Sequence, residues 1–432
     1  MPPRHRFALA LSLPLSLAAM LAALWLPALP APLTPIVVPN PEFDAARAGA
    51  QLARWTAQFP RRVVGSGSSA AFRALLQTEL ADLGLTVTTQ PFSVTVASQA
   101  RAGVNVLAGE AAGGLLLTAA YDTAEFGGRD NLAAVAALLE LARVFAPQRL
   151  PIAFLFADSG EYGQAAGSQA YLAAAPPEAR PWAVLSLEAL AGQDWERLRV
   201  EGAGYLTGYA PVELRKLGLE AARFVGAAAA EPQGAEEALV RALPFKMTGP
   251  GLWLAAGVPA LGFSTSPLPA AGVSLQKLGQ AAEYWTRSLA ARRGLVPAGA
   301  AGDWRLDDTR QLPAWAAGLV TLLAFGPLFT ATAIAGWAER PARQLLWPEL
   351  VAWWGASLPV LNGFAAVFIV LRLGWLPGYE RFPAAPGDPF LLQPADWVML
   401  LSLAVAGVSA WDIWRARGWG RLAERLAVPS RR

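Results

Sequence analysis

The sequence predicts an α/β fold with a mainly parallel sheet and helices on both faces, joined to a helical transmembrane region. Short apolar runs alternate with segments of helical periodicity between about residues 43 and 291, and this alternation is typical of parallel strands connected by helices. Longer apolar runs precede and follow this part. The composition agrees, because 54% of the residues are hydrophobic and only 16% are charged, whereas an ordinary soluble domain has about 25% charged residues.

Each helix and strand is predicted from its own pattern of apolar residues. Helices are expected at residues 43–59, 71–83, 131–145, 165–174, 211–224, 235–243 and 275–291. Strands are expected at residues 85–96, 114–120, 152–157, 183–188 and 259–265. The second helix should end at Gly84, and the preceding Gly65-Ser66-Gly67-Ser68 indicates a turn.

Four apolar runs are long enough, or nearly so, to cross about 30 Å of hydrocarbon. They cover residues 7–29, 312–337, 345–371 and 397–413. Residues 1–30 are expected to be an uncleaved N-terminal anchor, with a removed signal peptide as the alternative, because the small-residue cleavage signal is poor. Residues 31–296 then form the α/β domain and 297–311 a linker. Three transmembrane helices follow within 312–417, and 418–432 form a basic cytoplasmic tail.

Basic residues beside the apolar runs predict the orientation in the membrane. If every run crosses, three groups of arginines lie on one side, which the positive-inside rule makes cytoplasmic. The large domain is then extracytoplasmic, and the chain is a multi-pass protein of the cell membrane. These groups are Arg4 and Arg6; Arg340 and Arg343; and Arg415, Arg417, Arg421 and Arg425.

Missing residue types exclude several kinds of chemistry. The chain has no cysteine, which excludes disulfides, thiolate nucleophiles and cysteine metal sites. Its only histidine is His5, in the N-terminal leader, although zinc sites and acid–base catalysis usually draw on histidine. The net charge is +3, but the basic residues are scattered or lie beside apolar runs. We therefore expect the membrane as a partner and no nucleic acid.

Six short motifs follow one another in an order that points to a known family. They are PRRVVGS (60–66), AAYDT (119–123), GRDNLAAVA (128–136), FADSGEYG (156–163) with Gly167-Ser168, SLE (186–188) and AGVPAL (256–261). Together they resemble the co-catalytic dizinc aminopeptidases, which are zinc exopeptidases of the leucyl-aminopeptidase and aminopeptidase-Y type. Each motif is weak alone, and their shared order over roughly residues 43–292 is specific. The resemblance implies a zinc-exopeptidase-like fold.

The resemblance also implies roles for four acidic residues. Asp130 matches the aspartate that bridges two zinc ions, and Glu188 matches a further carboxylate ligand. Asp122 matches the aspartate that orients the first zinc histidine. Glu161 matches a zinc ligand, or, in a second alignment, the general base. From the residues alone, a helix N-cap is the favoured interpretation of Asp130. Glu188 fits a solvent-facing strand end equally well, and Asp122 fits a loop turn better than a role beside a missing histidine.

Other positions of the same motifs lack the family's functional groups. Ala120 stands where the first zinc histidine should be, and Pro250 where the second should be. Gly160 stands at the general-base position in the first alignment of Glu161; in the second alignment, Tyr162 stands at a ligand position. Zinc, which the family uses, therefore lacks both of its histidine ligands, and no cofactor is expected.

A carboxylate-only site is the remaining way to hold a metal. Asp130, Glu161 and Glu188, with Asp122 or Glu125, would offer only oxygen ligands. Such ligands suit Ca²⁺, Mg²⁺ or Mn²⁺ better than Zn²⁺. An empty, hydrogen-bonded polar pocket is the alternative.

Three functional hypotheses follow. The first is a degenerate, catalytically inactive member of the family that is anchored in the membrane and binds or assembles with peptides or other membrane proteins. The second is a residual metal-dependent hydrolase that uses Glu161 and a carboxylate-only site. The third is a transport or assembly function of the membrane region, with the outer domain as an accessory. Metal content and peptide hydrolysis discriminate the first two.

Overall fold

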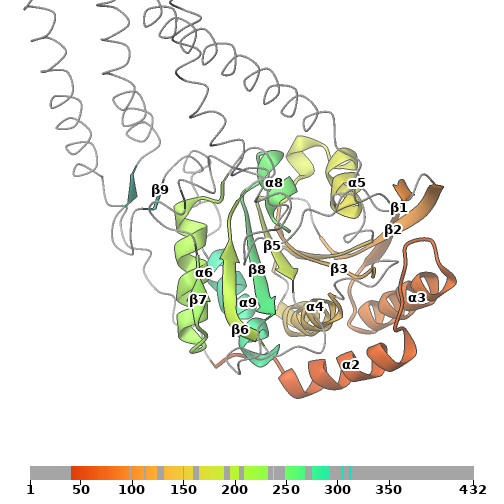
Figure 1. The fold of residues 1–432 in the computed structure, drawn as a ribbon, viewed down its shortest axis with the longest axis horizontal. Coiled ribbons are helices and arrows are strands. Elements are labelled where there is room, and N and C mark those ends of the chain that lie inside the picture. The colour runs from red at the N-terminus through yellow and green to blue at the C-terminus, as the bar shows by residue number, and fades with distance from the viewer. Residues whose placement is uncertain are drawn as a thin grey trace, which may run out of the picture. The chain divides into compact units, whose positions relative to one another are not determined.

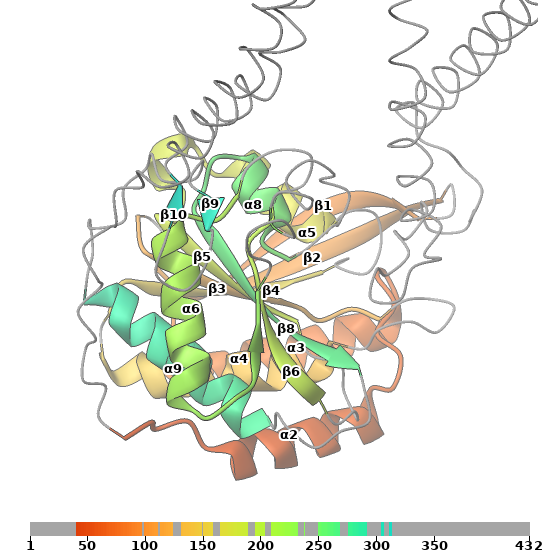
Figure 2. The same cartoon turned by 60° about the vertical axis from the view of Figure 1, so that its left-hand side comes forward.

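The computed structural model describes residues 40–96, 99–110, 113–123, 131–148, 150–158, 165–188, 195–203, 209–231, 237, 249–267, 275–291, 304–305 and 311–312. All of them lie in one of the two compact units into which the chain divides. That unit is an α/β domain, shown in two views in Figures 1 and 2.

Helices and strands alternate along most of this domain. The helices are α2 (Ala45–Gln58), α3 (Gly67–Asp82), α4 (Leu132–Phe145), α5 (Ala166–Ala174), α6 (Val212–Phe224), α8 (Gly251–Ala255) and α9 (Leu275–Ala290), with short 3-10 turns at Ala146–Gln148 and Pro177–Ala179. The strands are β1 (Val87–Val96), β2 (Gln99–Gly109), β3 (Leu115–Ala120), β4 (Ile152–Ala157), β5 (Ala183–Glu188), β6 (Trp195–Glu201), β7 (Ala229–Ala230), β8 (Ala260–Pro267), β9 (Trp304–Arg305) and β10 (Gln311–Leu312).

The main sheet has eight strands in the order β1-β2-β4-β3-β5-β8-β6-β7. Its centre, β4-β3-β5-β8, is parallel, while β1 with β2, β2 with β4, and β6 with β8 are antiparallel. The sheet is therefore mixed. The expected parallel pairing is found in its centre and between β6 and β7, and the other pairings are antiparallel. The apolar runs identify buried central strands, whereas the direction of the outer strands depends on connections that an apolar pattern does not record.

Helices cover both faces of this sheet (Figures 1 and 2). The central helix α4 packs on β3, β4 and β5 and is covered in turn by α2 and α9. Every residue of α4 except Arg143 is buried, as expected for a helix enclosed between a sheet and other helices. On the other face, α5 and α8 pack against each other. The expected arrangement of helices on both faces is confirmed.

Strands β4 and β5 begin and end where the sequence predicts, whereas several other elements, among them the two-residue strands β7, β9 and β10, were not predicted. The longer strands β2 and β6 and the helix α8 were not predicted either. Helix α3 begins four residues earlier than expected, because Ser66 is its N-cap and accepts a hydrogen bond from the Ser69 backbone N–H at 3.1 Å. The predicted turn at residues 65–68 therefore contains the helix start. Of the predicted helix at 235–243, only Glu237 is described.

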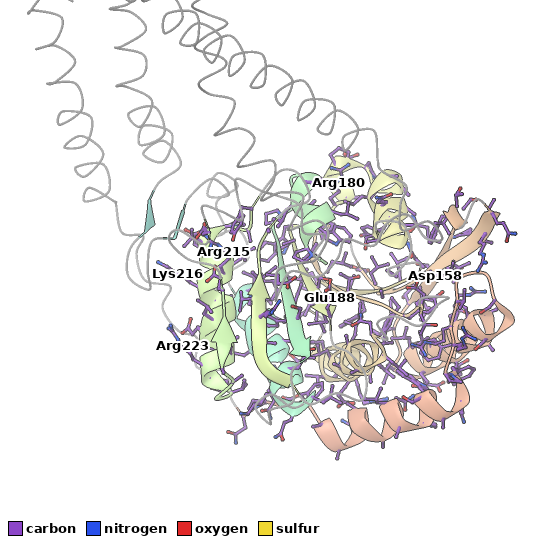
Figure 3. The ribbon with its side chains drawn as sticks, viewed as in Figure 1. Asp158, Arg180, Glu188, Arg215, Lys216 and Arg223 are labelled. Carbon is purple, nitrogen blue, oxygen red and sulfur yellow. The ribbon has the colours of Figure 1, made fainter. Side chains whose placement is uncertain are left out.

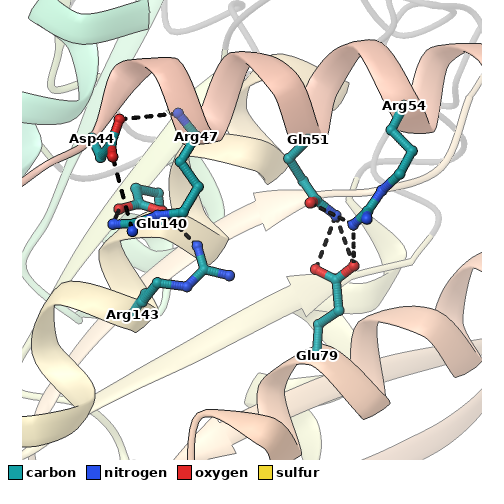
Figure 4. A network of polar contacts seen from close by, with 7 residues as sticks. All are labelled: Asp44, Arg47, Gln51, Arg54, Glu79, Glu140 and Arg143. Atoms are coloured by element: carbon teal, nitrogen blue, oxygen red, sulfur yellow. Dashed lines mark hydrogen bonds and ion pairs between the residues drawn. The ribbon is translucent and has the colours of Figure 1, made fainter.

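Polar contacts attach the first helix of the domain to its neighbours (Figure 4). Arg47 of α2 donates to the buried carboxylate of Glu140 in α4, with Nε at 2.9 Å from Oε2. Farther along α2, Gln51 and Arg54 both donate to Glu79 of α3, at 2.8 Å and 2.7 Å. Helix α2 is thus held to two different helices by side-chain carboxylates.

The chain just before α2 is fixed by a third carboxylate. Glu283 of α9 is fully buried and accepts the backbone N–H groups of Glu42 and Phe43 at 3.1 Å and 2.9 Å. The ring of Phe43 lies on Gly279 of the same helix, where a Cβ would overlap it. The domain is therefore anchored to its own N-terminal segment from residue 42 onward.

The four predicted membrane spans lie outside the described residues, except that Leu312 belongs to β10. Strands β9 and β10 pair antiparallel within the segment expected as a linker and at its end. Within the described part of the chain, no helix has both the length and the apolar character that crossing a bilayer requires.

Candidate functional site

Two of the predicted site positions lie at the carboxyl ends of the central parallel strands. Ala120 is the last residue of β3 and Glu188 the last residue of β5, and these strands are neighbours. Asn131, at the start of α4, donates from Nδ2 to the carbonyl oxygens of Ala120 (3.3 Å) and Leu187 (3.2 Å). The chain directly after Asp130 is therefore held between the ends of two strands, where ligands bind in α/β folds.

The structure also shows that the N-cap interpretation of Asp130 is wrong. The N-cap of α4 is Asn131, not Asp130, and its side chain makes no capping hydrogen bond. The Asn131 amide turns to the two strands instead, because both carbonyl groups at the strand ends need a donor. The side chain of Asp130 lies outside the described residues.

A second segment packs over the same strand ends. A Cβ on Gly249 would overlap Ser186 Oγ and Glu188 Oε1, so only glycine fits against these two side chains of β5. The next residue, Pro250, is buried. A Cβ on Gly262 of β8 would lie 2.8 Å from Pro250 Cδ. The proline ring therefore fills the space over β8 at the position where the resemblance places a zinc histidine.

A buried arginine fixes the loop that follows β3. Arg62 is fully buried; its Nε donates to the Tyr121 carbonyl oxygen at 2.8 Å and its backbone N–H to Thr123 Oγ1 at 2.7 Å. The Thr123 N–H donates back to the Arg62 carbonyl at 3.2 Å. Asp122 lies between these two anchored residues and is itself fully buried. The arginine in the first of the six motifs is thus a structural support for the loop that carries Asp122.

Beyond the end of β4, two side chains take the place of a strand as hydrogen-bond partners of the Val104 backbone in β2. Asp158 is the first residue after β4, and its Oδ2 accepts the Val104 N–H at 3.0 Å. Tyr121 is the first residue after β3, and its hydroxyl donates to the Val104 carbonyl at 2.7 Å. Burial, together with the nearby Asp158 carboxylate, raises the pKa of Tyr121 above its ordinary value. The phenol therefore remains a donor throughout the neutral range.

Asn105 of β2 connects the end of β4 with the start of α5. Its Oδ1 accepts the Asp158 N–H at 3.1 Å, and its Nδ2 donates to the Gly167 carbonyl at 2.8 Å. The side chain is completely buried. Sequence reasoning missed this residue because β2 itself was not predicted. A single amide inside the otherwise apolar Val-Asn-Val-Leu of residues 104–107 was the available signal.

The remaining predicted site residues cannot be placed on this framework. Asp130, Glu161, Gly160 and the alternatives Glu125 and Tyr162 lie outside the described residues. Asp158 and Glu188 are labelled at the ends of their strands in Figure 3. Among the residues that the structure does describe, no three His, Cys, Asp or Glu side chains are grouped closely enough to hold a metal ion.

The residues at the two histidine positions do not fit zinc. The methyl group of Ala120 and the ring of Pro250 have no lone pair to donate, and the Pro250 ring is packed against Gly262. Zinc sites take histidine nitrogen, cysteine sulfur or carboxylate oxygen. Among the described site positions only Glu188 and Asp122 carry such a group, in each case a carboxylate.

Residues 104–271 match the family model of Peptidase family M28. This segment runs from β2 through β8 and contains the strand ends described above. The domain is therefore M28 peptidase-like. No curated protein sequence matches the chain.

Several solved structures are similar to this chain. A glutaminyl cyclase from Fimbriiglobus ruber is 20% identical, covers 60% of this chain and 99% of its own, and has a TM-score of 0.47. A glutaminyl cyclase from Porphyromonas gingivalis is 21% identical, covering 58% and 99% with a TM-score of 0.46. A Zn-dependent exopeptidase from Parabacteroides distasonis is 19% identical, covering 59% and 99% with a TM-score of 0.46.

Proposed function

We propose that the chain is a membrane-anchored protein whose M28 peptidase-like domain binds or assembles with peptides or other membrane proteins and does not act as a zinc aminopeptidase. The domain descends, in this proposal, from an aminopeptidase of the leucyl or Y type. Its strand-end site keeps the architecture of that enzyme without the groups that would hold its metal.

One observation supports this proposal most strongly. Pro250 stands at a histidine position, and its ring is packed on Gly262 beside the glycine that contacts Glu188. A histidine cannot be supplied from elsewhere in the domain, because His5 is the only one in the sequence. The site therefore lacks both imidazole donors and has close packing at one of their positions.

The membrane part of the proposal rests on the sequence. The apolar runs and the arginines beside them favour an anchor at each end of the domain and an extracytoplasmic position for it. A binding role at the outer surface of the membrane suits a domain that has kept its fold without its metal ligands.

A residual hydrolase with a carboxylate-only metal site is the second candidate. It is favoured by the place of Glu188 at the end of β5, next to the strand-end bridge that Asn131 makes. Asp130, which directly precedes Asn131 in the sequence, would supply the second oxygen ligand in this candidate. Oxygen ligands at that edge would select Ca²⁺, Mg²⁺ or Mn²⁺.

Hydrolysis of an N-terminal residue tests the two candidates. The full chain, purified in detergent, is incubated with leucine p-nitroanilide and with unblocked peptides in the presence of Zn²⁺, Mn²⁺ or Ca²⁺. We expect the chain to release no more p-nitroaniline or free amino acid than a matched variant in which Asp130, Glu161 and Glu188 are all alanine. The reaction needs a metal-bound water, and the metal has no complete set of ligands in this site.

Two outcomes separate the candidates. Release with Zn²⁺ that is lost in the triple variant contradicts the proposal. Release only with Mn²⁺ or Ca²⁺ contradicts it equally and supports the second candidate. Fluorescence anisotropy of labelled peptides measures the binding role directly. The proposal predicts saturable binding of peptides that mass spectrometry then finds intact.

A further inference from the structure

The outer edge of β1 is the exposed end of the main sheet. Strand β1 is the first strand in the sheet order, and within the described residues only β2 pairs with it. Its ten residues, VTTQPFSVTV, contain no charged side chain. Long uncharged edge strands rich in β-branched residues tend to pair with strands of other molecules, and proteins protect such edges with charges, bulges or proline.

The hydrogen bonds of β2 show which residues of β1 direct their backbone outward. Val104, which pairs with Pro91, directs its N–H and carbonyl away from β1, to Asp158 and Tyr121. Residues two apart in a strand point the same way. Pro91 therefore faces outward together with Val87, Thr89, Ser93 and Thr95, and the backbone groups of these residues line the free edge.

Pro91 stands in the middle of that edge and is exposed. It has no N–H, and its ring Cδ occupies the position from which a partner strand would receive a hydrogen bond. Two outward residues with N–H groups lie on each side of it. We infer that Pro91 prevents the edge of β1 from pairing with β1 of a second copy of this chain.

Without Pro91, the edge of β1 would fit β1 of a second copy of this chain in both symmetry and charge. An antiparallel pair centred on residue 91 places Thr89 opposite Ser93 of the second copy and Val87 opposite Thr95, so all remaining N–H groups meet carbonyl groups. No like charges oppose each other, because β1 has no charges. Only the central pair, proline against proline, cannot form.

Cross-linking through introduced cysteines tests this inference in the full chain, which has no cysteine of its own. Thr89→Cys and Ser93→Cys are introduced together in the natural background and in a Pro91→Val background. Both side chains are exposed and would be direct neighbours across the two copies. Within one copy they are about 13 Å apart along the strand, which a short bis-maleimide cannot span.

We expect the cross-linked dimer to rise about tenfold on Pro91→Val, because valine restores the hydrogen bonds of the central pair. Pro91→Lys also restores the N–H, but it places two positive charges opposite each other in the central pair. The amount of cross-linked dimer should therefore stay near that of the natural chain. Thr78→Cys, exposed on α3, measures random collisions. A Pro91→Thr background replaces valine if the melting temperature shows that Pro91→Val does not fold. Equal cross-linking with proline and with valine, whether high or absent, overturns the inference.

Discussion

Replacing Arg215 with methionine should lower the free energy of unfolding by about 3–5 kcal/mol, the usual cost of removing one partner from a buried ion pair. Arg215 of α6 is fully buried. Its Nη1 donates to Glu231 Oε1 at 2.7 Å and to Glu237 Oε2 at 3.0 Å, and its Nη2 donates to Glu237 Oε1 at 3.1 Å. Both glutamates are buried as well, so the variant removes the Arg215 charge from two buried carboxylates.

The electrostatics of this cluster explain why methionine cannot replace the arginine. Burial by itself lowers the pKa of Arg215, but the carboxylates of Glu231 and Glu237 outweigh it and raise that pKa above its ordinary value. The guanidinium also lies over the Tyr209 ring, with Cζ at 4.7 Å from the ring centroid. The charged form is therefore strongly favoured in the folded protein.

Denaturant unfolding of the full chain in detergent measures the effect, with Arg54→Met as the matched control. Arg54 also donates to a glutamate, at 2.7 Å, but its side chain is 51% exposed; its loss should cost less than about 1 kcal/mol. Adding Glu237→Gln to Arg215→Met should recover part of the loss, since one of the two buried negative charges beside residue 215 disappears. Equal effects of the two arginine variants would show that the buried cluster has no special importance.

The second large effect is expected for Asn105→Leu, which should cost about 2–4 kcal/mol. Leucine is close to asparagine in size but leaves the buried Asp158 N–H without its acceptor and the Gly167 carbonyl without the amide donor. These two groups mark the end of β4 and the start of α5, so the loss falls at the edge of the sheet that carries the candidate site.

Thermal unfolding of Asn105→Leu and of Thr78→Val separates burial from the mere loss of a hydrogen bond. Thr78 Oγ1 donates to the Ala74 carbonyl at 3.1 Å on an exposed face of α3. Its replacement should change the stability by no more than about 0.5 kcal/mol. If Asn105→Leu melts at the same temperature as the natural chain, then the Asn105 amide is not a support of the strand-end site.

The sequence was sufficient to predict the central strands of this fold and insufficient for its borders. Strand β4 is buried throughout and β5 is buried except at Glu188, and such strands produce short apolar runs that can be seen directly. Strand β6 (WERLRVE) alternates charged and apolar residues near the sheet edge, so its apolar signal is weak. Helix α8 has only five residues and is shorter than the window in which helical periodicity can be recognised.

The candidate site was predictable as a set of positions but not as a set of contacts. Ala120, Glu188 and Pro250 were found because motif order survives in the sequence. The structure places Ala120 and Glu188 at the carboxyl ends of β3 and β5 and packs Pro250 on Gly262 of β8. The packing of Pro250 on Gly262 joins residues from different elements. Such a contact depends on tertiary structure, which no local pattern encodes.

Arg62 and Asn131, which support the loop and the strand ends, also make contacts that no local sequence pattern predicts. Arg62 and Asn131 lie within quoted motifs, yet their hydrogen bonds to Tyr121 and Leu187 connect segments about 60 residues apart in the sequence. Sequence reasoning could therefore locate these residues without predicting that each one holds a loop or a strand end in place.

The zinc content of the purified chain tests the central claim most directly. The full chain is prepared in detergent without chelators, equilibrated with Zn²⁺, freed of unbound metal, and analysed by plasma mass spectrometry beside the variant with alanine at Asp130, Glu161 and Glu188. Because Ala120 and Pro250 offer no donors, we predict the same trace of zinc in both samples. One or two equivalents of zinc in the natural chain, absent from the variant, would contradict the account.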